Sequence, residues 1–340
     1  AIFLDLTTNP TAPDYIGEWN DFYIHDGMVR GDTLYAGCVY QGELYIVNVS
    51  DKSNPITLGN HATPTSFTHN AWISDDGNYV FTTDEKPDAF ITAYDISTMN
   101  NIKEVDRIQS NPGSSSIPHN AHVEGNFLIT SYYRDGTTVH DITYPNNMIQ
   151  VAYYDSYLGS GNGFDGCWGT YPFLPSGNII STDINSSSNG NARLLVLERG
   201  FTQACYVEGS VTDATTGSVL SGAEVVIVNT SIADTVSSNL FGDYFSGTAN
   251  SGVYNVIISK TGYISDTLNA FLSNGSVTIL NAPLYPVGYV PAAVNDISNN
   301  RPSILIDIVD LQGRKSNPKK NTSLFYIYTD GKIKKQIIID

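Results

Sequence analysis

The sequence predicts an all-β chain that opens with a partial β-propeller of four-stranded blades, and three observations carry this prediction. Charged residues make up only 15% of the chain, whereas 22 Tyr and 29 Gly are typical of strands joined by turns. A histidine-centred block recurs, with 44 residues from His25 to His69 and 50 from His69 to His119. Apolar segments follow each block, and repeats of this length in strand-rich chains indicate a propeller.

Each copy of the block places a histidine directly before an Asp or Asn, and the third copy adds a second histidine. A later segment resembles a fourth copy without the histidine, because Asp165 stands 45 residues after Asn120. We expect the innermost strand of each blade to begin at its block, the fourth near Phe164. The candidate ligand-binding residues are therefore His25, Asp26, His69, Asn70, His119, Asn120, His122 and Asp165.

Three further strands are expected after each block, which completes a four-stranded blade. The second strand is short and apolar, at residues 33–37, 78–82, 126–130 and 178–182. The third strand ends in Asp or Asn, whose side chain can hydrogen-bond the next backbone amides and close a turn. A fourth strand follows, as at residues 103–108. The third strands are expected at residues 2–7, 45–50, 92–97 and 138–143.

Residues 44–55, with the sequence LYIVNVSDKSNP, resemble the LVIVD repeat. The order of the His-Asp and His-Asn blocks resembles the choice-of-anchor B proteins, which are secreted bacterial β-propellers. This resemblance covers about residues 1–200. Residues 1–20 supply only the outer strands of a blade. We therefore expect residues 1–203 to form an N-terminally incomplete propeller with about four visible blades.

From residue 204 the pattern changes to alternating strands separated by glycine-containing turns, which is typical of a small β-sandwich. The segments 205–213, 216–227 and 252–263 carry Gly-x-Val-x-Asp, Leu-x-Gly-Ala and Gly-x-Tyr elements. These elements resemble the carboxypeptidase regulatory-like domain, a transthyretin-like β-sandwich. The resemblance implies an accessory spacer or binding domain over residues 204–285.

The last part of the chain is expected to be a linker and a small β domain. Prolines among small and polar residues predict a linker over residues 286–303. From Leu311 onward, seven Lys or Arg stand against two Asp or Glu, so this stretch carries 7 − 2 = +5. The sequences DLQGR and GKIKKQIII in residues 304–340 resemble the C-terminal sorting domain of the type IX secretion system. That resemblance implies the type IX secretion machinery as a partner and an extracellular or outer-cell-surface location.

Composition excludes several classes of partner and site. The net charge of -17 argues against nucleic acid, whose phosphates would be repelled. Cys38, Cys167 and Cys205 are too few for a disulfide framework and lack CxxC zinc spacing, so one pair plus one free thiol stays open. No apolar run is long enough for a transmembrane segment, and the first residues resemble a strand rather than a signal peptide.

The histidine blocks admit two interpretations. In the first, imidazoles and carboxylates gather at one mouth of the central channel and bind a ligand. Imidazole and carboxylate suit Zn, Cu, Ni or Fe, so a divalent metal ion on His25, His69 and His119 is a candidate cofactor; Asp and Asn oxygens alone would suit Ca. In the second, each pair only closes the loop into its strand, because repeated residues in repeat proteins usually serve the repeat.

The expected function is that of a binding module rather than an enzyme, because no serine or cysteine nucleophile motif is present. The ligand would be extracellular: a glycan, a protein or a metal ion. Trp19, Trp72 and Trp168 could form a sugar-stacking platform or pack between blades. The alternative function is an extracellular metal-dependent hydrolase or oxidase that uses the His/Asp ring, since propellers host both binding proteins and enzymes.

Overall fold

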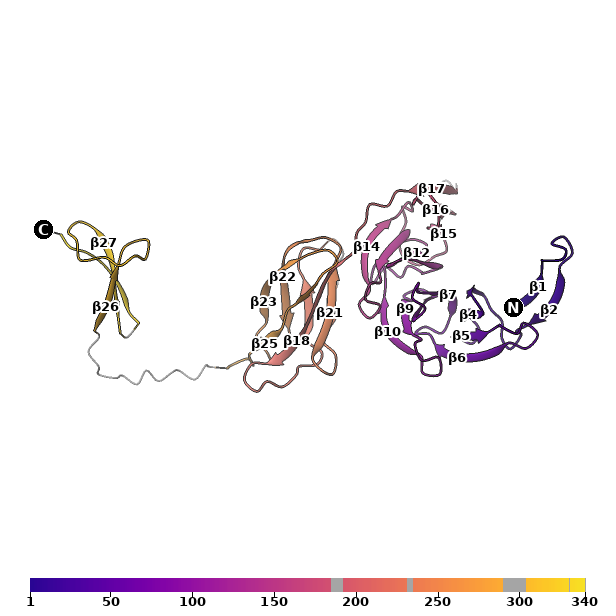
Figure 1. Ribbon diagram of the computed structural model, residues 1–340, viewed down its shortest axis with the longest axis horizontal. Coiled ribbons are helices and arrows are strands. Elements are labelled where there is room, and N and C mark those ends of the chain that lie inside the picture. Colours follow the sequence, from indigo (N-terminus) through magenta and orange to yellow (C-terminus); the bar gives the residue numbers. More distant parts are fainter. Residues whose placement is uncertain (185–191, 231–234, 290–303, 330, 340) are drawn as a thin grey trace. The chain divides into compact units, whose positions relative to one another are not determined.

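The structure, a computed structural model, describes residues 1–340 except 185–191, 231–234, 290–303, 330 and 340. Every regular element in these described residues is a β-strand (Figure 1). The chain divides into two units, Ala1–Val287 and Gly288–Asp340. The first unit holds propeller blades and a β-sandwich, and the second holds one small sheet. The predicted all-β fold with a partial propeller is confirmed.

Three complete blades follow one another, each a four-stranded antiparallel sheet in sequence order. The first strands of successive blades contact one another, so they are the innermost strands (Figure 1). Blade 1 comprises β3 (Asp26–Arg30), β4 (Thr33–Cys38), β5 (Glu43–Asn48) and β6 (Ile56–Ala62). Blade 2 comprises β7 (Thr68–Ile73), β8 (Tyr79–Asp84), β9 (Ile91–Asp95) and β10 (Lys103–Ile108). Blade 3 comprises β11 (Ala121–Glu124), β12 (Phe127–Ser131), β13 (Thr137–Asp141) and β14 (Ile149–Tyr154).

Shorter sheets stand at both ends of this series. In the described residues β1 (Ile2–Asp5) pairs only with β2 (Asp14–Glu18). Blade 4 has three strands in the described residues, β15 (Cys167–Tyr171), β16 (Ile179–Asp183) and β17 (Arg193–Leu197). The innermost strand β15 contacts β11 and β12 of blade 3, which continues the ring of blades.

Apolar side chains fill the space between blades, which explains why the second and third strands are apolar on both faces. Leu44 and Ile46 of blade 1 pack with Ala71 and Val80 of blade 2 in one buried cluster. A second cluster joins blades 2 and 3, and a third joins blades 3 and 4. Burial of each large aliphatic side chain stabilises the fold by about 2 kcal/mol, so blade-to-blade packing supplies most of the propeller's core.

The turns after the third strands form as predicted. In all four cases the Asp or Asn side chain accepts a hydrogen bond from the backbone amide two residues later, at 2.8 or 2.9 Å. Such a bond replaces the strand partner that the chain loses as it leaves the sheet. The pairs are Asp5 with Thr7, Asn48 with Ser50, Asp95 with Ser97, and Asp141 with Thr143.

Two sheets with one shared core form the sandwich. The first contains β18 (Cys205–Asp213), β21 (Asp243–Thr248), β24 (Val277–Ile279) and β25 (Ala282–Leu284). The second contains β19 (Glu224–Ile227), β20 (Thr235–Ser237), β22 (Gly252–Ser259) and β23 (Asp266–Leu272). Buried residues of both sheets, including Val207, Val225, Val256 and Leu272, make a single cluster.

The second unit is a three-stranded antiparallel sheet of β26 (Leu305–Val309), β27 (Ser323–Tyr328) and β28 (Ile333–Ile337). The DLQGR motif forms a turn in which the Asp310 carboxylate accepts hydrogen bonds from the backbone amides of Gln312 and Arg314. Most of the predicted linker, residues 290–303, lies outside the described residues.

Two further features bear on the expectations from composition. Cys38, Cys167 and Cys205 are all buried and none is in a disulfide. Among the residues that the structure describes, none belongs to a helix that could cross a lipid bilayer.

Candidate metal and ligand site

The three repeated histidines lie in one row at the end of the blades where the innermost strands begin. The ring centroids of His25 and His69 are 4.4 Å apart, and those of His69 and His119 are also 4.4 Å apart. His69 and His119 are buried, with 3% and 7% exposure, whereas His25 is exposed. The structure therefore brings the three imidazoles of blades 1, 2 and 3 together.

A β-bulge at the start of the innermost strand places these side chains. In blade 2, Thr68 pairs with Asp84 and Asn70 with Thr83, so His69 is an extra residue in the ladder. In blade 4, Cys167 pairs with Asp183 and Gly169 with Thr182, so Trp168 is the extra residue there. A bulge redirects the side chain of the extra residue. Trp168 thus holds in blade 4 the position that His69 holds in blade 2.

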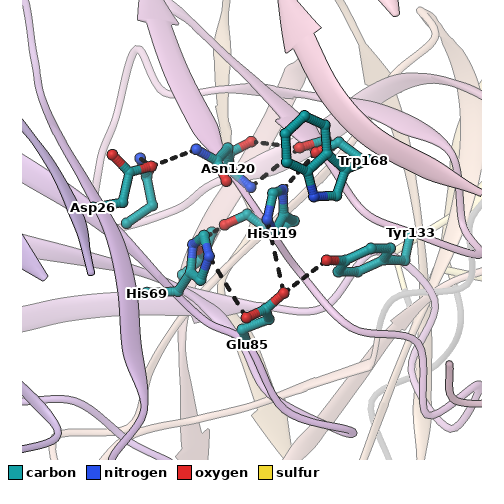
Figure 2. A network of polar contacts seen from close by, with 10 residues as sticks. Asp26, His69, Glu85, His119, Asn120, Tyr133 and Trp168 are labelled. Atoms are coloured by element: carbon teal, nitrogen blue, oxygen red, sulfur yellow. Dashed lines mark hydrogen bonds and ion pairs between the residues drawn. The ribbon is translucent and has the colours of Figure 1, made fainter. Parts of the chain in front are cut away.

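Glu85, which the sequence interpretation missed, lies against this row. Its two carboxylate oxygens face two different histidines: Oε2 is 3.5 Å from His69 Nε2, and Oε1 is 3.7 Å from His119 Nε2 (Figure 2). The Tyr133 hydroxyl donates a 2.7 Å hydrogen bond to Glu85 Oε1. Glu85 directly follows β8 and its side chain is 14% exposed. One carboxylate therefore connects two blades.

The tautomer of His119 follows from its other contact. Nδ1 of His119 lies 2.5 Å from the backbone oxygen of Trp168 (Figure 2). Because a carbonyl oxygen only accepts, Nδ1 must donate, and in the neutral ring Nε2 then carries the lone pair. That lone pair faces Glu85. A nitrogen lone pair and a carboxylate oxygen repel each other unless a proton or a cation lies between them.

Burial sets the charge state of the site. It lowers the pKa of His69 to about 3, helped by the neighbouring His119 and His25, and lowers the pKa of His119 to about 4. Burial also raises the pKa of the Glu85 carboxyl. At neutral pH the two buried imidazoles are therefore uncharged, which is the form that binds metal ions.

The group of residues that fits a metal ion contains Glu85 in place of the expected His119. One ligand atom each from His25, His69 and Glu85 lies within 4.8 Å of the others. In a tetrahedral zinc site with bonds of about 2.0–2.1 Å, ligand atoms are roughly 3.3 Å apart, so small side-chain shifts would complete it. His119 adjoins this group through Glu85 Oε1. Three protein ligands would leave a fourth position open.

The Asp and Asn of the blocks have different partners from the histidines. Asp26 Oδ2 accepts hydrogen bonds from Asn70 Nδ2 at 3.1 Å and from Asn120 Nδ2 at 2.5 Å (Figure 2). Asn70 Oδ1 in turn accepts a bond from the backbone amide of Ala121. We call Asp26, Asn70 and Asn120 the Asx ring. It joins blades 1, 2 and 3, so the role expected of these residues within each loop extends across the blade boundaries.

Two predicted site residues lie apart from the row. The His122 ring is 4.5 Å from that of Trp72 and 5.9 Å from that of Phe173, and burial lowers its pKa to about 4. Asp165 Oδ2 accepts a 2.5 Å bond from Arg134 Nη2, before β15 begins. The structural register thus places Asp165 elsewhere than the spacing suggested, because loops of unequal length separate the blades.

The β-sandwich is the part of the chain that matches a family model. Residues 206–285 match the model of the carboxypeptidase regulatory-like domain. This segment is a carboxypeptidase regulatory-like domain. The predicted identity of the sandwich is confirmed, and the histidine row and Glu85 lie outside this domain. The resemblances of residues 1–203 to the LVIVD propellers and of residues 304–340 to the sorting domain stay predictions.

A search of curated proteins finds no match to the chain. Solved structures with similarity to this chain include the computationally designed Ika4 protein, at 13% identity and TM-score 0.38, covering 54% of this chain and 96% of that one. Hydrazine synthase of Kuenenia stuttgartiensis aligns at 13% identity and TM-score 0.36, covering 89% and 73%. A protein of unknown function from Bacteroides thetaiotaomicron aligns at 10% and 0.38, covering 74% and 57%. At such values these similarities carry no argument about the site.

Proposed function

We propose that this chain is a binding protein whose propeller holds a divalent transition-metal ion on His25, His69 and Glu85, with His119 beside the site. One observation carries the proposal: ligand atoms from these three residues of two blades lie within 4.8 Å of one another. Imidazole nitrogen with a single carboxylate is a ligand set typical of Zn²⁺ and of other first-row transition metals.

The electrostatics of Glu85 support this proposal. A carboxylate shielded from water needs compensating charge or donors, because burying it alone costs several kcal/mol. The contacts described for Glu85 are one hydroxyl donor, from Tyr133, and the Nε2 atoms of His69 and His119. Burial keeps both rings neutral, so neither adds positive charge, and Nε2 of His119 presents a lone pair. A metal ion supplies the charge and accepts that lone pair.

Calorimetric titration tests the proposal. Protein freed of metal with EDTA and titrated with ZnCl₂ should bind one ion, and H69A and E85A should each lower the affinity by more than about 100-fold, since losing a ligand costs more than losing its orienting partner. The matched control is H61A, because His61 lies on β6 outside the row. No zinc binding by the wild type, or equal loss in H61A, would refute the proposal.

The same proposal includes the location of the protein: the type IX secretion machinery exports it through residues 304–340, to the cell surface or beyond. Support comes from the separate unit Gly288–Asp340 and from the excess of Lys and Arg within it. Deleting residues 304–340 should stop surface delivery in the native host and leave metal binding intact. Unchanged secretion of the shortened chain would contradict this part of the proposal.

The open coordination position favours one alternative, an extracellular metal-dependent hydrolase or oxidase. Catalytic zinc sites keep three protein ligands and one exchangeable water. The discriminating measurement is turnover of a chromogenic ester by zinc-loaded protein. A rate that E85Q and EDTA both abolish would favour the enzyme, and metal binding without turnover favours the binding protein.

A further inference from the structure

Aromatic rings extend the histidine row on both sides. On the blade 1 side, Tyr23 is 6.2 Å from His25 and Tyr40 is 5.1 Å from Tyr23, measured between ring centroids. On the blade 4 side, the Trp168 ring is 5.5 Å from that of His119. A branch runs from His119 to Tyr133 at 5.0 Å and on to Phe164 at 5.3 Å. The rings therefore form one continuous series across three blades and the start of the fourth.

The outer rings of this series face solvent. Tyr40 is 78% exposed, Phe164 56%, and Tyr23 and Trp168 each 52%. Trp19, by contrast, is 3% exposed, and Trp72 stacks on Phe173. Of the three tryptophans, Trp168 is the exposed one that lies at the row. Aromatic faces left in water on both sides of a polar cluster are available to a ligand.

Two of these exposed residues, Trp168 and Phe164, have contacts that position them. The backbone oxygen of Trp168 accepts the hydrogen bond from His119, and the residue sits at a bulge in β15. Phe164 packs edge-on against Tyr133, at an interplanar angle of 88°. A ring fixed before binding loses little conformational entropy when a ligand arrives. Positioned aromatic residues thus lie on the blade 4 side of the histidine row.

We infer that this aromatic rim, made of Tyr23, Tyr40, Phe164 and Trp168, binds a neutral glycan. The C–H faces of a pyranose ring stack on flat aromatic side chains, and the polar groups between the two sides suit its hydroxyls. The exposed imidazole of His25 offers these hydroxyls a donor and an acceptor. The net charge of -17 disfavours anionic polymers, including nucleic acids and uronate-rich glycans. Binding through the rim needs no metal, so this inference goes beyond the proposed metal site.

Affinity electrophoresis tests the rim directly. The full chain should be retarded in gels that contain one of four soluble neutral polysaccharides: a β-1,3-glucan, a mixed-linkage β-glucan, a xylan or a galactomannan. W168A and Y40A should each weaken the retarding interaction by roughly 5- to 100-fold, the effect seen when stacking rings are removed from base-binding proteins. Y40A guards against misfolding of W168A, because Tyr40 is the most exposed ring of the rim.

The matched control is Y153A. Tyr153 on β14 is 62% exposed, so its removal deletes a comparable ring outside the rim. Y153A should bind as the wild type does, and EDTA-treated protein should bind as well, which separates this result from the metal titration. No retardation by any of the four polysaccharides, or equal weakening in Y153A, would overturn the inference. Binding to a protein ligand instead, with the same dependence on Trp168, would overturn it too.

Discussion

The histidine row and the Asx ring come from the same blocks, so their members are adjacent in sequence, yet they contact different parts of the propeller. The rings of His69 and His119 face Glu85 and the aromatic rim. The side chains of Asn70 and Asn120 instead donate to Asp26, across two blade boundaries. One repeated dipeptide therefore serves two purposes: one residue joins the blades, and its neighbour faces the candidate site.

The bulge explains how two adjacent residues, His and Asn, can both point toward neighbouring blades. In a regular strand, successive side chains point to opposite faces, so only one of two adjacent residues could face the centre. Blade 3 shows the exception: the amide of His119 donates to the Ser131 carbonyl, and the Ser131 amide donates to the Asn120 carbonyl. Two residues thus oppose one, and both side chains reach groups from other blades. The comparison can be tested by changing one half of a block at a time.

The largest expected effect is the stabilisation of the folded protein by zinc, which should depend on the site at the histidine row and not on the Asx ring. Zinc at about 1,000 times its dissociation constant should stabilise the metal-free protein by about 4 kcal/mol, because it binds only the folded site. E85Q, which keeps the shape and removes the charge, should lose most of this gain. Thermal unfolding with and without ZnCl₂ measures it. D26A should keep the zinc-dependent increment; its loss there would show that ring and row are not separable.

The next effect concerns the ring alone. Asp26→Ala should lower the free energy of unfolding of the metal-free protein by about 2–3 kcal/mol, since it leaves the amides of the buried Asn70 and the partly buried Asn120 without their acceptor. Urea denaturation followed by near-UV circular dichroism measures this. Asp32→Ala is the control, because the Asp32 side chain is 68% exposed. Equal stability of D26A and D32A would mean that the Asx ring contributes nothing.

The same contrast shows what the sequence could predict. Strands and Asx turns depend on residues close in sequence, so the turn from Asn48 to Ser50 was predicted correctly. The row was found because its histidines recur. Glu85 was missed because it occurs once: the positions two residues beyond Gly37, Thr83 and Ser131 hold Val39, Glu85 and Tyr133. The fourth copy was aligned on Asp165 because residue counting assumes equal loops, and only the ladder reveals the bulge at Trp168.

A smaller effect concerns His140, a buried histidine outside the row. His140 is fully buried within blade 3, and burial lowers its pKa from 6.5 to about 4. The unfolded chain therefore binds more protons than the folded chain between these values, so stability is complete above about pH 6.5 and falls as the pH drops toward 4. In metal-free protein, H140Q should reduce the slope of stability against pH by up to about 1.4 kcal/mol per pH unit. An unchanged slope would show that His140 does not take up a proton on unfolding.

The smallest effect concerns the hydroxyl that holds Glu85. Tyr133 lies at the position that Glu85 occupies one blade earlier, and its φ of 26° places a bulky residue in the left-handed region. Because its hydroxyl donates to Oε1, it leaves Oε2 oriented toward His69. Tyr133→Phe removes this bond but keeps the ring, so zinc affinity should fall by about 10-fold, the effect typical of losing a partner that orients a ligand. The stability of the metal-free protein should change by less than about 1.5 kcal/mol.

Calorimetric titration of Y133F beside E85A measures the difference in zinc affinity. A loss as complete as in E85A would make Tyr133 itself a ligand, and no loss would mean that the row and its bulges position Glu85 without help.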